Sequence, residues 1–358
     1  MVGLKLRYFV LRRLLLLIPT LIGLTLIVFV LTKVGGDQRL IGEYINLHST
    51  IPAVVQAQEV AQRFHLNDPL IVQYFYWLVS LVHGDWGYTR TLVYDGSVLD
   101  AISLFFPNTL VLATLSSLLT ALIGIPLGVW SAVRKDSVLD QATRVISFAG
   151  YAIPTFWLGL VLIIAFGSAN VCRCLDIFPI SGTVDVSLIG GVNWFIGGIS
   201  YPSHILMIDS LIHGRIDIFS DSVMHLILPV ITLTYGIMAS VLRIMRSSMQ
   251  DTLNQDYIRT ARAKGLSENV VINVHARRNA LIPVFTLLGY TIASLLGGAV
   301  ITETVFNYPG IGYWTTQAIL NGDQGGIMGA TIIFGLAFIF ANLIVDIAYG
   351  FLDPRIRY

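Results

Sequence analysis

Between two long apolar segments lies the polar, basic stretch Asp256-Tyr257-Ile258-Arg259-Thr260-Ala261-Arg262-Ala263-Lys264-Gly265. We expect a short helix over residues 251–264, with Asp251 as its N-cap. Gly265 suits the end of this helix, because helices commonly end on a residue with positive φ. The small side chains of Ala261 and Ala263 leave room for another protein to approach. A helix that lies among lipid headgroups has a similar pattern, so the residues alone leave both interpretations open.

The composition of the chain indicates a membrane protein. Of its 358 residues, 55% are hydrophobic and 12% are charged, with a mean hydropathy of +0.75. Soluble domains carry about a quarter of charged residues, so we expect an integral membrane protein in contact with the lipid bilayer. A nucleic-acid-binding protein needs a concentrated basic face. Here the net charge is +1 and the basic residues lie beside apolar segments, which excludes nucleic acid as a partner.

Several segments are apolar enough to cross a bilayer, whose hydrocarbon core of about 30 Å needs roughly 20 helical residues. The sequence therefore predicts an all-α integral membrane protein with six transmembrane helices. We place these at residues 12–32, 107–133, 145–167, 223–243, 280–302 and 327–351.

The segments between the spans predict the domain organisation. An N-terminal region, 1–106, contains the first span and a long loop segment, 33–106, with helices expected near residues 53–65 and 69–82. The rest of the chain, 107–358, forms a five-helix core. This core contains an insertion at 168–222 and the loop at 244–279.

Lys and Arg are distributed unevenly between the two sides of the predicted spans. Most of the 22 Lys and Arg residues lie in the two terminal segments and in the loops 134–144 and 244–279. Cytoplasmic loops of membrane proteins are enriched in these residues. We therefore expect both termini and the loop 244–279 in the cytoplasm, with 33–106 and 168–222 outside.

The polar stretch also resembles a known pattern. From Asp256 to Leu266, and again over Arg278-Asn279-Ala280-Leu281-Ile282-Pro283, the chain resembles the coupling loop of ABC-transporter permeases. In particular it is similar to the first permease subunit of the dipeptide/oligopeptide/nickel importer family. The general pattern has Glu-Ala-Ala where this chain has Arg259-Thr260-Ala261. Arg-Thr-Ala is common in the peptide subgroup, so the departure marks that subgroup.

Four other stretches carry the same resemblance, which covers essentially the whole chain except 168–222. They are His83-Gly84-Asp85-Trp86-Gly87, Ile153-Pro154-Thr155-Phe156-Trp157-Leu158-Gly159, Glu303-Thr304-Val305-Phe306-Asn307-Tyr308-Pro309-Gly310-Ile311-Gly312 and Leu352-Asp353-Pro354-Arg355-Ile356-Arg357.

The resemblance implies the type I ABC-importer permease (MetI-like) fold in a prokaryotic cell membrane. It implies as partners a second homologous permease subunit, two ABC ATPase subunits and an extracytoplasmic substrate-binding protein. This sequence contains no Gly-x-x-x-x-Gly-Lys-Ser/Thr phosphate-binding loop. We therefore expect ATP and Mg to bind to the ATPase subunits, and no catalytic, cofactor or metal site on this chain. The implied cargo is a di- or oligopeptide, with oligosaccharides or nickel as alternatives.

The resemblance assigns the docking of an ATPase to the helix in the loop 244–279. The residues expected to take part are Asp256, Tyr257, Arg259, Thr260, Ala261, Arg262, Ala263, Lys264 and Gly265. At the other side of the membrane, Phe306 and Pro309 are candidates for an external gate or pathway. Glu303 either lines that gate or caps the loop that follows it.

Three further residues need an interpretation. Asp346 is an ionisable residue inside a predicted span, where charges are costly and often functional. We favour a structural role for it over a proton relay. Cys172 and Cys174 lie in a segment expected outside the cell, where oxidation occurs. A disulfide between them is predicted, although the single intervening residue would strain the ring and an unpaired state stays open.

Two other classes of membrane protein compete with this prediction. A secondary transporter or channel often shows internal repeats, interrupted spans or lone intramembrane charges along its pathway. An intramembrane enzyme needs a catalytic constellation such as His-Glu-x-x-His, and none is present in the spans. Neither class explains the loop at 244–279, so an importer permease is the favoured function.

Overall fold

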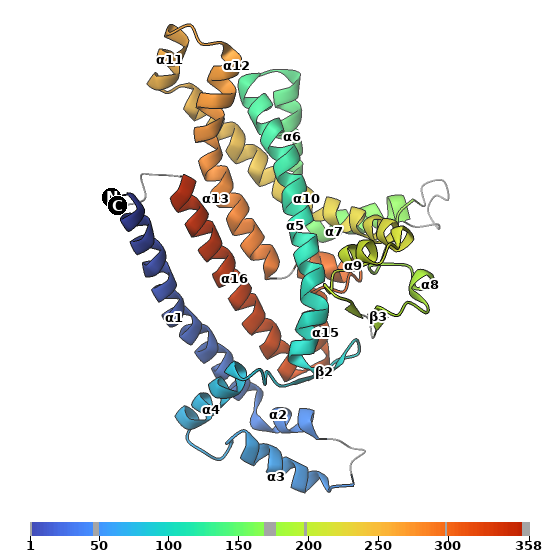
Figure 1. The fold of residues 1–358 in the computed structure, drawn as a ribbon. Helices are drawn as coiled ribbons and strands as arrows, with labels where there is room; N and C mark the ends of the chain where they lie inside the picture. Colours follow the sequence, from blue (N-terminus) through green and yellow to red (C-terminus); the bar gives the residue numbers. More distant parts are fainter. Residues whose placement is uncertain (1, 46–49, 168–176, 197–198, 298, 353–358) are drawn as a thin grey trace.

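The computed structural model describes residues 2–45, 50–167, 177–196, 199–297 and 299–352. Most of these residues are helical, and the strands form only two short hairpins within the described ranges. Figure 1 shows long helices running between two ends of the molecule. We name these ends after the short helices they carry: the α11 end and, opposite to it, the α4 end.

Long apolar helices form the framework. They are α1 (Val2–Gly35), α5 (Val98–Val133), α10 (Ile216–Leu253), α13 (Arg277–Leu296) and α16 (Gln324–Leu352). Five helical segments in the described part of the chain are long and apolar enough to cross a membrane: Leu11–Val34, Val98–Val133, Ile216–Leu253, Glu268–Leu296 and Gln324–Ile347. These match five of the six predicted spans, and the all-α membrane fold is confirmed.

The remaining predicted span, 145–167, is not one straight helix. It divides into α6 (Val138–Ala152) and α7 (Thr155–Leu162), and α7 continues as the π-helix η1 (Ile163–Gly167). The two parts are bent by 103°. Pro154 explains the break, because a proline forces the residue before it out of the helical region. Ile153 accordingly has φ −87° and ψ 117°.

Short elements at the α4 end follow α1. They are α2 (Asp37–Tyr44), α3 (Ala53–Arg63) and α4 (Leu70–Val82), followed by the antiparallel strands β1 (Tyr88–Arg90) and β2 (Asp95–Ser97). In this hairpin Tyr88 pairs with Ser97 and Arg90 with Asp95. The two helices expected near 53–65 and 69–82 are thus confirmed to within a few residues. Gly84 and Gly87, at φ 87° and 95°, make the turn between α4 and β1.

The insertion 168–222 is described only from residue 177, so Cys172 and Cys174 lie outside the described residues. Its described part contains α8 (Val186–Ile189), β3 (Phe195–Ile196), β4 (Ile199–Ser200) and α9 (Leu206–Ile212). After α13 come α14 (Val300–Val305) and α15 (Ile311–Asn321), which lead into α16.

Helices α5 and α10 pack closely because glycine faces the partner helix. A Cβ added at Gly128 would stand 2.6 Å from Cβ of Met245, closer than two carbon atoms can approach. Gly289 of α13 faces Val345 of α16 in the same way. Small residues allow such close approach of helices in membranes, and they place α5, α10 and α13 around a shared apolar core at the α11 end.

Candidate functional site at the α11 end

The polar stretch forms a separate short helix, α11 (Asp256–Ala263). It begins five residues later than predicted, because α10 continues through Asp251 to Leu253 before the chain turns. The prediction that Asp251 caps the short helix is therefore wrong. The N-cap position belongs to Gln255, which has extended backbone angles and makes no side-chain capping bond. Asp256 lies in the first turn, where a negative charge suits the helix dipole.

The C-terminal end of α11 is a Schellman motif. Gly265 has φ 76°, as predicted from its position in the sequence. Its N–H donates to the carbonyl of Arg262 at 2.9 Å, and the N–H of Leu266 donates to the carbonyl of Ala261 at 3.4 Å. These two bonds are the 5→2 and 6→1 pair that defines the motif. The helix therefore ends at a fixed point and the chain reverses there.

Helix α11 has one buried side and one exposed side. Ile258 is fully buried and Ala261 is 7% exposed, and both belong to the apolar core shared by α5, α10 and α13. Ala261 therefore faces its own chain and does not offer the small outer surface expected for it. The opposite side is exposed. It carries Asp256, Tyr257, Arg259, Thr260, Arg262, Ala263 and Lys264.

Polar contacts join α11 to the chain that follows it. Arg262 forms an ion pair with Glu268 of α12 (Glu268–Val270), with 2.7 Å between Nε and Oε1. The side chain of Asn279 in α13 donates a hydrogen bond to the hydroxyl of Tyr257 at 2.8 Å. Both pairs are exposed, so each contributes less than about 1 kcal/mol. Their main effect is to fix the direction of α11 relative to α13.

A π-helix connects α12 to the membrane helix α13. This segment, η3 (Val271–Ala276), has its first and last residues fully buried in the same core as Ile258. Its six residues continue directly into Arg277, the first residue of α13. Helix α11 thus packs, through Ile258 and Ala261, on the one apolar core that α10, η3 and the start of α13 share.

A buried carboxylate connects α6 to the same assembly. Asp140 is completely buried and accepts two hydrogen bonds from Arg246 of α10, at 2.6 and 3.0 Å. Arg144 of α6 donates to it at 2.6 Å, and the hydroxyl of Ser131 in α5 donates at 2.6 Å. This cluster ties three helices together at the α11 end. The i, i+4 spacing of Asp140 and Arg144 was visible in the sequence, whereas the pairing with Arg246 was not.

Glu303, in the short helix α14 that follows α13, caps another helix. Its carboxylate accepts hydrogen bonds from the hydroxyl of Thr109 at 2.8 Å and from the N–H of Tyr313, in the first turn of α15, at 2.9 Å. Burial raises the pKa of this carboxyl, and the bonds from Thr109 and Tyr313 oppose that shift. A Cβ at Gly310 would lie 2.4 Å from the Glu303 carboxyl carbon, so glycine provides the necessary space.

The structure therefore places Glu303 where it caps the loop, the second of the two expected roles. Phe306 is 1% exposed and packs against Gly159 of α7, so that two of the recognised sequence stretches meet. The carbonyl of Pro309 accepts a hydrogen bond from Asn108 at 2.8 Å. In the single chain, Glu303 and Phe306 are inside the protein, and a gate role for these three residues stays a prediction.

Asp346, the charge inside the last span, forms an ion pair with Arg13 of α1, with 2.8 Å between Oδ2 and Nη1. The pair joins the first and last membrane helices. This geometry supports the structural interpretation of Asp346.

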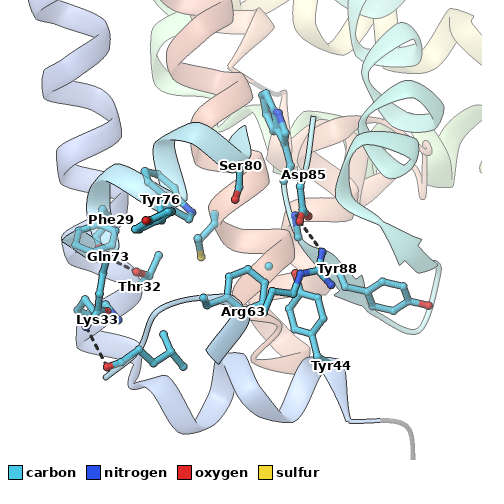
Figure 2. Close-up of a pocket in the computed structure, with 17 residues that line it drawn as sticks. Phe29, Thr32, Lys33, Tyr44, Arg63, Gln73, Tyr76, Ser80, Asp85 and Tyr88 are labelled. Carbon is cyan, nitrogen blue, oxygen red and sulfur yellow. Dashed lines mark hydrogen bonds and ion pairs between the residues drawn. The ribbon is translucent and has the colours of Figure 1, made fainter. Parts of the chain in front are cut away.

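A small pocket lies at the α4 end among α1, α2, α3, α4 and α16 (Figure 2). Its wall includes the ion pair between Arg63 and Asp85, at 2.7 Å, and the side chains of Lys33, Tyr76 and Tyr88. The cavity volume of about 50 Å³ has room for a few water molecules but not for a peptide. The pocket is therefore no substrate chamber within the single chain.

These features define a class of protein. It is a multi-pass helical membrane protein with a short helix between two of its spans, whose polar side is exposed and whose apolar side packs on their shared core. The comparison with known families agrees. Residues 124–358 match the family described as binding-protein-dependent transport system inner membrane component, and the chain belongs to this family. It is thus a permease component of a transport system and an inner-membrane protein with several spans.

Relatives similar over nearly the full length are permeases of peptide transport systems. The chain is 38% identical to the oligopeptide transport system permease protein AppB of Bacillus subtilis over 353 residues, 98% of this chain and 99% of that protein. It is 38% identical to the di/tripeptide transport system permease protein DppB of Pseudomonas aeruginosa, with 98% of each covered. It is 37% identical to the dipeptide transport system permease protein DppB of Escherichia coli, again with 98% of each covered.

Proposed function

We propose that this chain forms half of the translocation pathway of an ATP-driven importer of di- or oligopeptides. The full-length similarity to three peptide permeases supports this cargo over the alternatives, oligosaccharides and nickel. Uptake of labelled dipeptide into vesicles that contain the reconstituted system tests it. Competition by unlabelled peptide is the expected result, and competition by oligosaccharide or nickel alone would replace the proposed cargo.

The proposed assembly contains a second homologous permease, two ABC ATPase subunits and an extracytoplasmic binding protein. ATP and Mg bind to the ATPase subunits in this assembly. Both termini and the α11 end face the cytoplasm, because Lys and Arg gather there. The α4 end and the insertion 168–222 then face the binding protein.

One observation carries the proposal for α11: its exposed side is polar, while its other side is buried against two membrane helices. Arg259, Thr260 and Ala263 occupy one face of the helix, opposite Ile258 and Ala261. A helix in lipid headgroups would be expected to present an apolar face to the bilayer. The apolar face of α11 is buried in the core of its own chain and is therefore not available to lipid. This favours a protein partner on the polar face.

Force from the ATPase would reach the membrane through rigid contacts. A partner shifts a conformational equilibrium only by its preference for one state over the other. Binding at α11 acts on α10 through the core around Ile258 and on α13 through η3. The hydrogen bonds of Asp140 to Ser131 and Arg246 connect α6 to α5 and α10, so that α5 and α6 would move with α10. Alternating access would then follow from movement of these helices as a unit.

Replacement of Ala263 by tryptophan tests the docking face. Ala263 is exposed on the face of α11 opposite the buried Ile258, so Ala263→Trp should fold normally and block a close partner. We expect loss of co-purifying ATPase subunits and of substrate-stimulated ATP hydrolysis. Val138→Trp is a matched control, because Val138 is 83% exposed on α6 at the same end. Unchanged ATPase association in Ala263→Trp would refute the docking role of this face.

A further inference from the structure

Helix α4 combines a strongly apolar sequence with an exposed position. Its thirteen residues, Leu-Ile-Val-Gln-Tyr-Phe-Tyr-Trp-Leu-Val-Ser-Leu-Val from Leu70 to Val82, contain no Asp, Glu, Lys or Arg. At 1.5 Å per residue the helix is roughly 20 Å long, too short to cross a bilayer core of about 30 Å. A helix of this composition is expected to be buried on all sides, and α4 is not.

One side of α4 is held by the protein. Gln73 is buried and donates hydrogen bonds to the carbonyls of Leu66 and Asp68, at 3.0 and 2.7 Å. With Tyr76 and Ser80 it lines the small pocket at this end of the molecule (Figure 2). These polar groups therefore face inward, toward the pocket.

The other side of α4 is an uncovered apolar stripe. Ile71 is 83% exposed, Phe75 61% and Val82 79%. Spacings of four and seven residues put these three side chains on one face of a helix. Exposure of three large apolar side chains in one row is costly in water. We therefore expect lipid or another protein to cover the stripe.

The contact with α1 shows at what depth this stripe lies. The Tyr74 hydroxyl is 2.9 Å from the Thr25 hydroxyl of α1, and Trp77 packs against Phe29 with 5.7 Å between ring centroids. Thr25 and Phe29 belong to the apolar segment Leu11–Val34, which is long enough to span the membrane. Figure 1 shows α4 beside the end of α1. Helix α4 is therefore packed against the membrane-spanning part of α1, level with its last turns.

We propose that α4 lies in the lipid interface of the leaflet at the α4 end, with Ile71, Phe75 and Val82 among the acyl chains. Three observations support a lipid partner: the absence of charge along the helix, the depth set by Thr25, and the continuity with exposed apolar residues of α1. Ile22 and Leu26, close to the contact, are 52% and 50% exposed. The aromatic rings of Tyr74 and Trp77, which contact α1, suit this depth, because Tyr and Trp gather at membrane interfaces.

This arrangement gives α4 a function that is independent of the role of α11. The helix forms an anchor that lies in the membrane plane, and its inner face forms one wall of the polar pocket. The Arg63–Asp85 ion pair and the hairpin β1–β2 are then held at a fixed height above the bilayer. Under the proposed orientation, this is the outer leaflet.

Spin-label accessibility measures the environment of the stripe directly. The full-length chain, with Cys172→Ser and Cys174→Ser, is purified with its partner subunits and reconstituted in lipid nanodiscs. A nitroxide is attached at Phe75→Cys, and its collision rates with O₂, which concentrates in lipid, and with water-soluble chromium oxalate are compared. Ile22→Cys on α1 is the lipid reference, and Glu59→Cys on the exposed face of α3 is the water reference.

We expect the label at Phe75 to behave like the label at Ile22, with chromium oxalate collisions lost. Labels at Ile71 and Val82 repeat the measurement, so that one poorly folded variant does not decide it. A label at Phe75 that collides with chromium oxalate as freely as the label at Glu59 would overturn the proposal. So would a label that is water-accessible until a binding protein is added, since the occupant of the stripe would then be that protein.

Discussion

Replacement of Gly265 by valine tests whether the end of α11 transmits force. Gly265 has φ 76°, and a Cβ placed there would meet nothing within 4 Å. The main effect of the substitution is therefore backbone strain, because the Cβ meets no neighbouring atom. For an L-residue the left-handed conformation costs about 1–2 kcal/mol, and a β-branched side chain is at the upper end of this range. The correctly capped turn would then become less populated by roughly 5- to 30-fold relative to alternatives.

The expected result is loss of coupling in a chain that still folds. If the turn relaxes, the bonds from Gly265 to Arg262 and from Leu266 to Ala261 are lost and the exit direction of α11 changes. We expect substrate-stimulated ATP hydrolysis in the reconstituted system to fall at least fivefold. The basal hydrolysis of the ATPase subunits should persist. Gly265→Asn should retain most of the stimulation, because Asn tolerates positive φ.

The chain offers a matched control at the end of α15. Gly322 has φ 66°, an open Cβ position, and the same pair of bonds, from Gly322 to Ile319 at 3.1 Å and from Asp323 to Ala318 at 2.9 Å. Gly322→Val should lower the melting temperature by a similar amount without the same loss of stimulation. If substrate stimulates ATP hydrolysis equally in Gly265→Val and in the unmodified protein, the end of α11 has no role in coupling. Equal loss in both variants would also refute that role, because the cause would then be general destabilisation.

Three further predictions concern the framework. Asp140→Asn removes the charge partner of Arg246 and leaves Arg144 paired with the exposed Asp136 alone, and it should destabilise the purified protein by about 3 kcal/mol, the lower end for a buried pair because Arg144 is 41% exposed. Asp136→Asn, at a 71% exposed carboxylate of the same cluster, should cost less than about 1 kcal/mol, and equal shifts in melting temperature would contradict the assignment. Glu303 has a raised pKa in the folded state, so its contribution to stability is greatest below the unfolded pKa and falls as pH rises through the folded pKa. The stability of the unmodified protein relative to Glu303→Gln should therefore decrease as pH rises above the unfolded pKa of Glu, and a pH-independent difference in melting temperature would refute this. Gly128→Val should destabilise by about 1–3 kcal/mol through contact with Met245, measured by thermal unfolding, whereas a stability equal to that of the unmodified protein would show that α5 and α10 can separate at no cost.

Much of this architecture could be predicted from local sequence. The long apolar segments of the sequence predicted five of the spans correctly. The position of Gly265 after a polar stretch predicted where α11 ends. The beginning of α11 was misplaced because residues 251–255 are compatible with a helix whether they end one helix or begin another. Only the turn at Asn254 and Gln255, seen in the structure, separates the two.

The contacts between distant segments could not be predicted in this way. The span predicted over 145–167 is bent by 103° at Pro154, and the size of this bend depends on how α6 and α7 pack against other helices. The pairing of Asp140 with Arg246 joins residues 106 positions apart. The contacts of Glu303 with Thr109 and Tyr313 likewise join residues 194 and 10 positions apart. Ala261 was assigned to the surface because small size alone does not tell which side of a helix is buried.

Photo-cross-linking from Thr260 tests the central claim most directly. Thr260 is exposed on the polar side of α11, and a photoreactive amino acid there reaches whatever covers this face. In membranes that contain the assembled transporter, we predict a cross-linked product with an ATPase subunit carrying a phosphate-binding loop, and a yield that changes when ATP is added. A probe at Thr260 that forms products only with lipid would show that α11 is an interfacial helix, and would contradict the account.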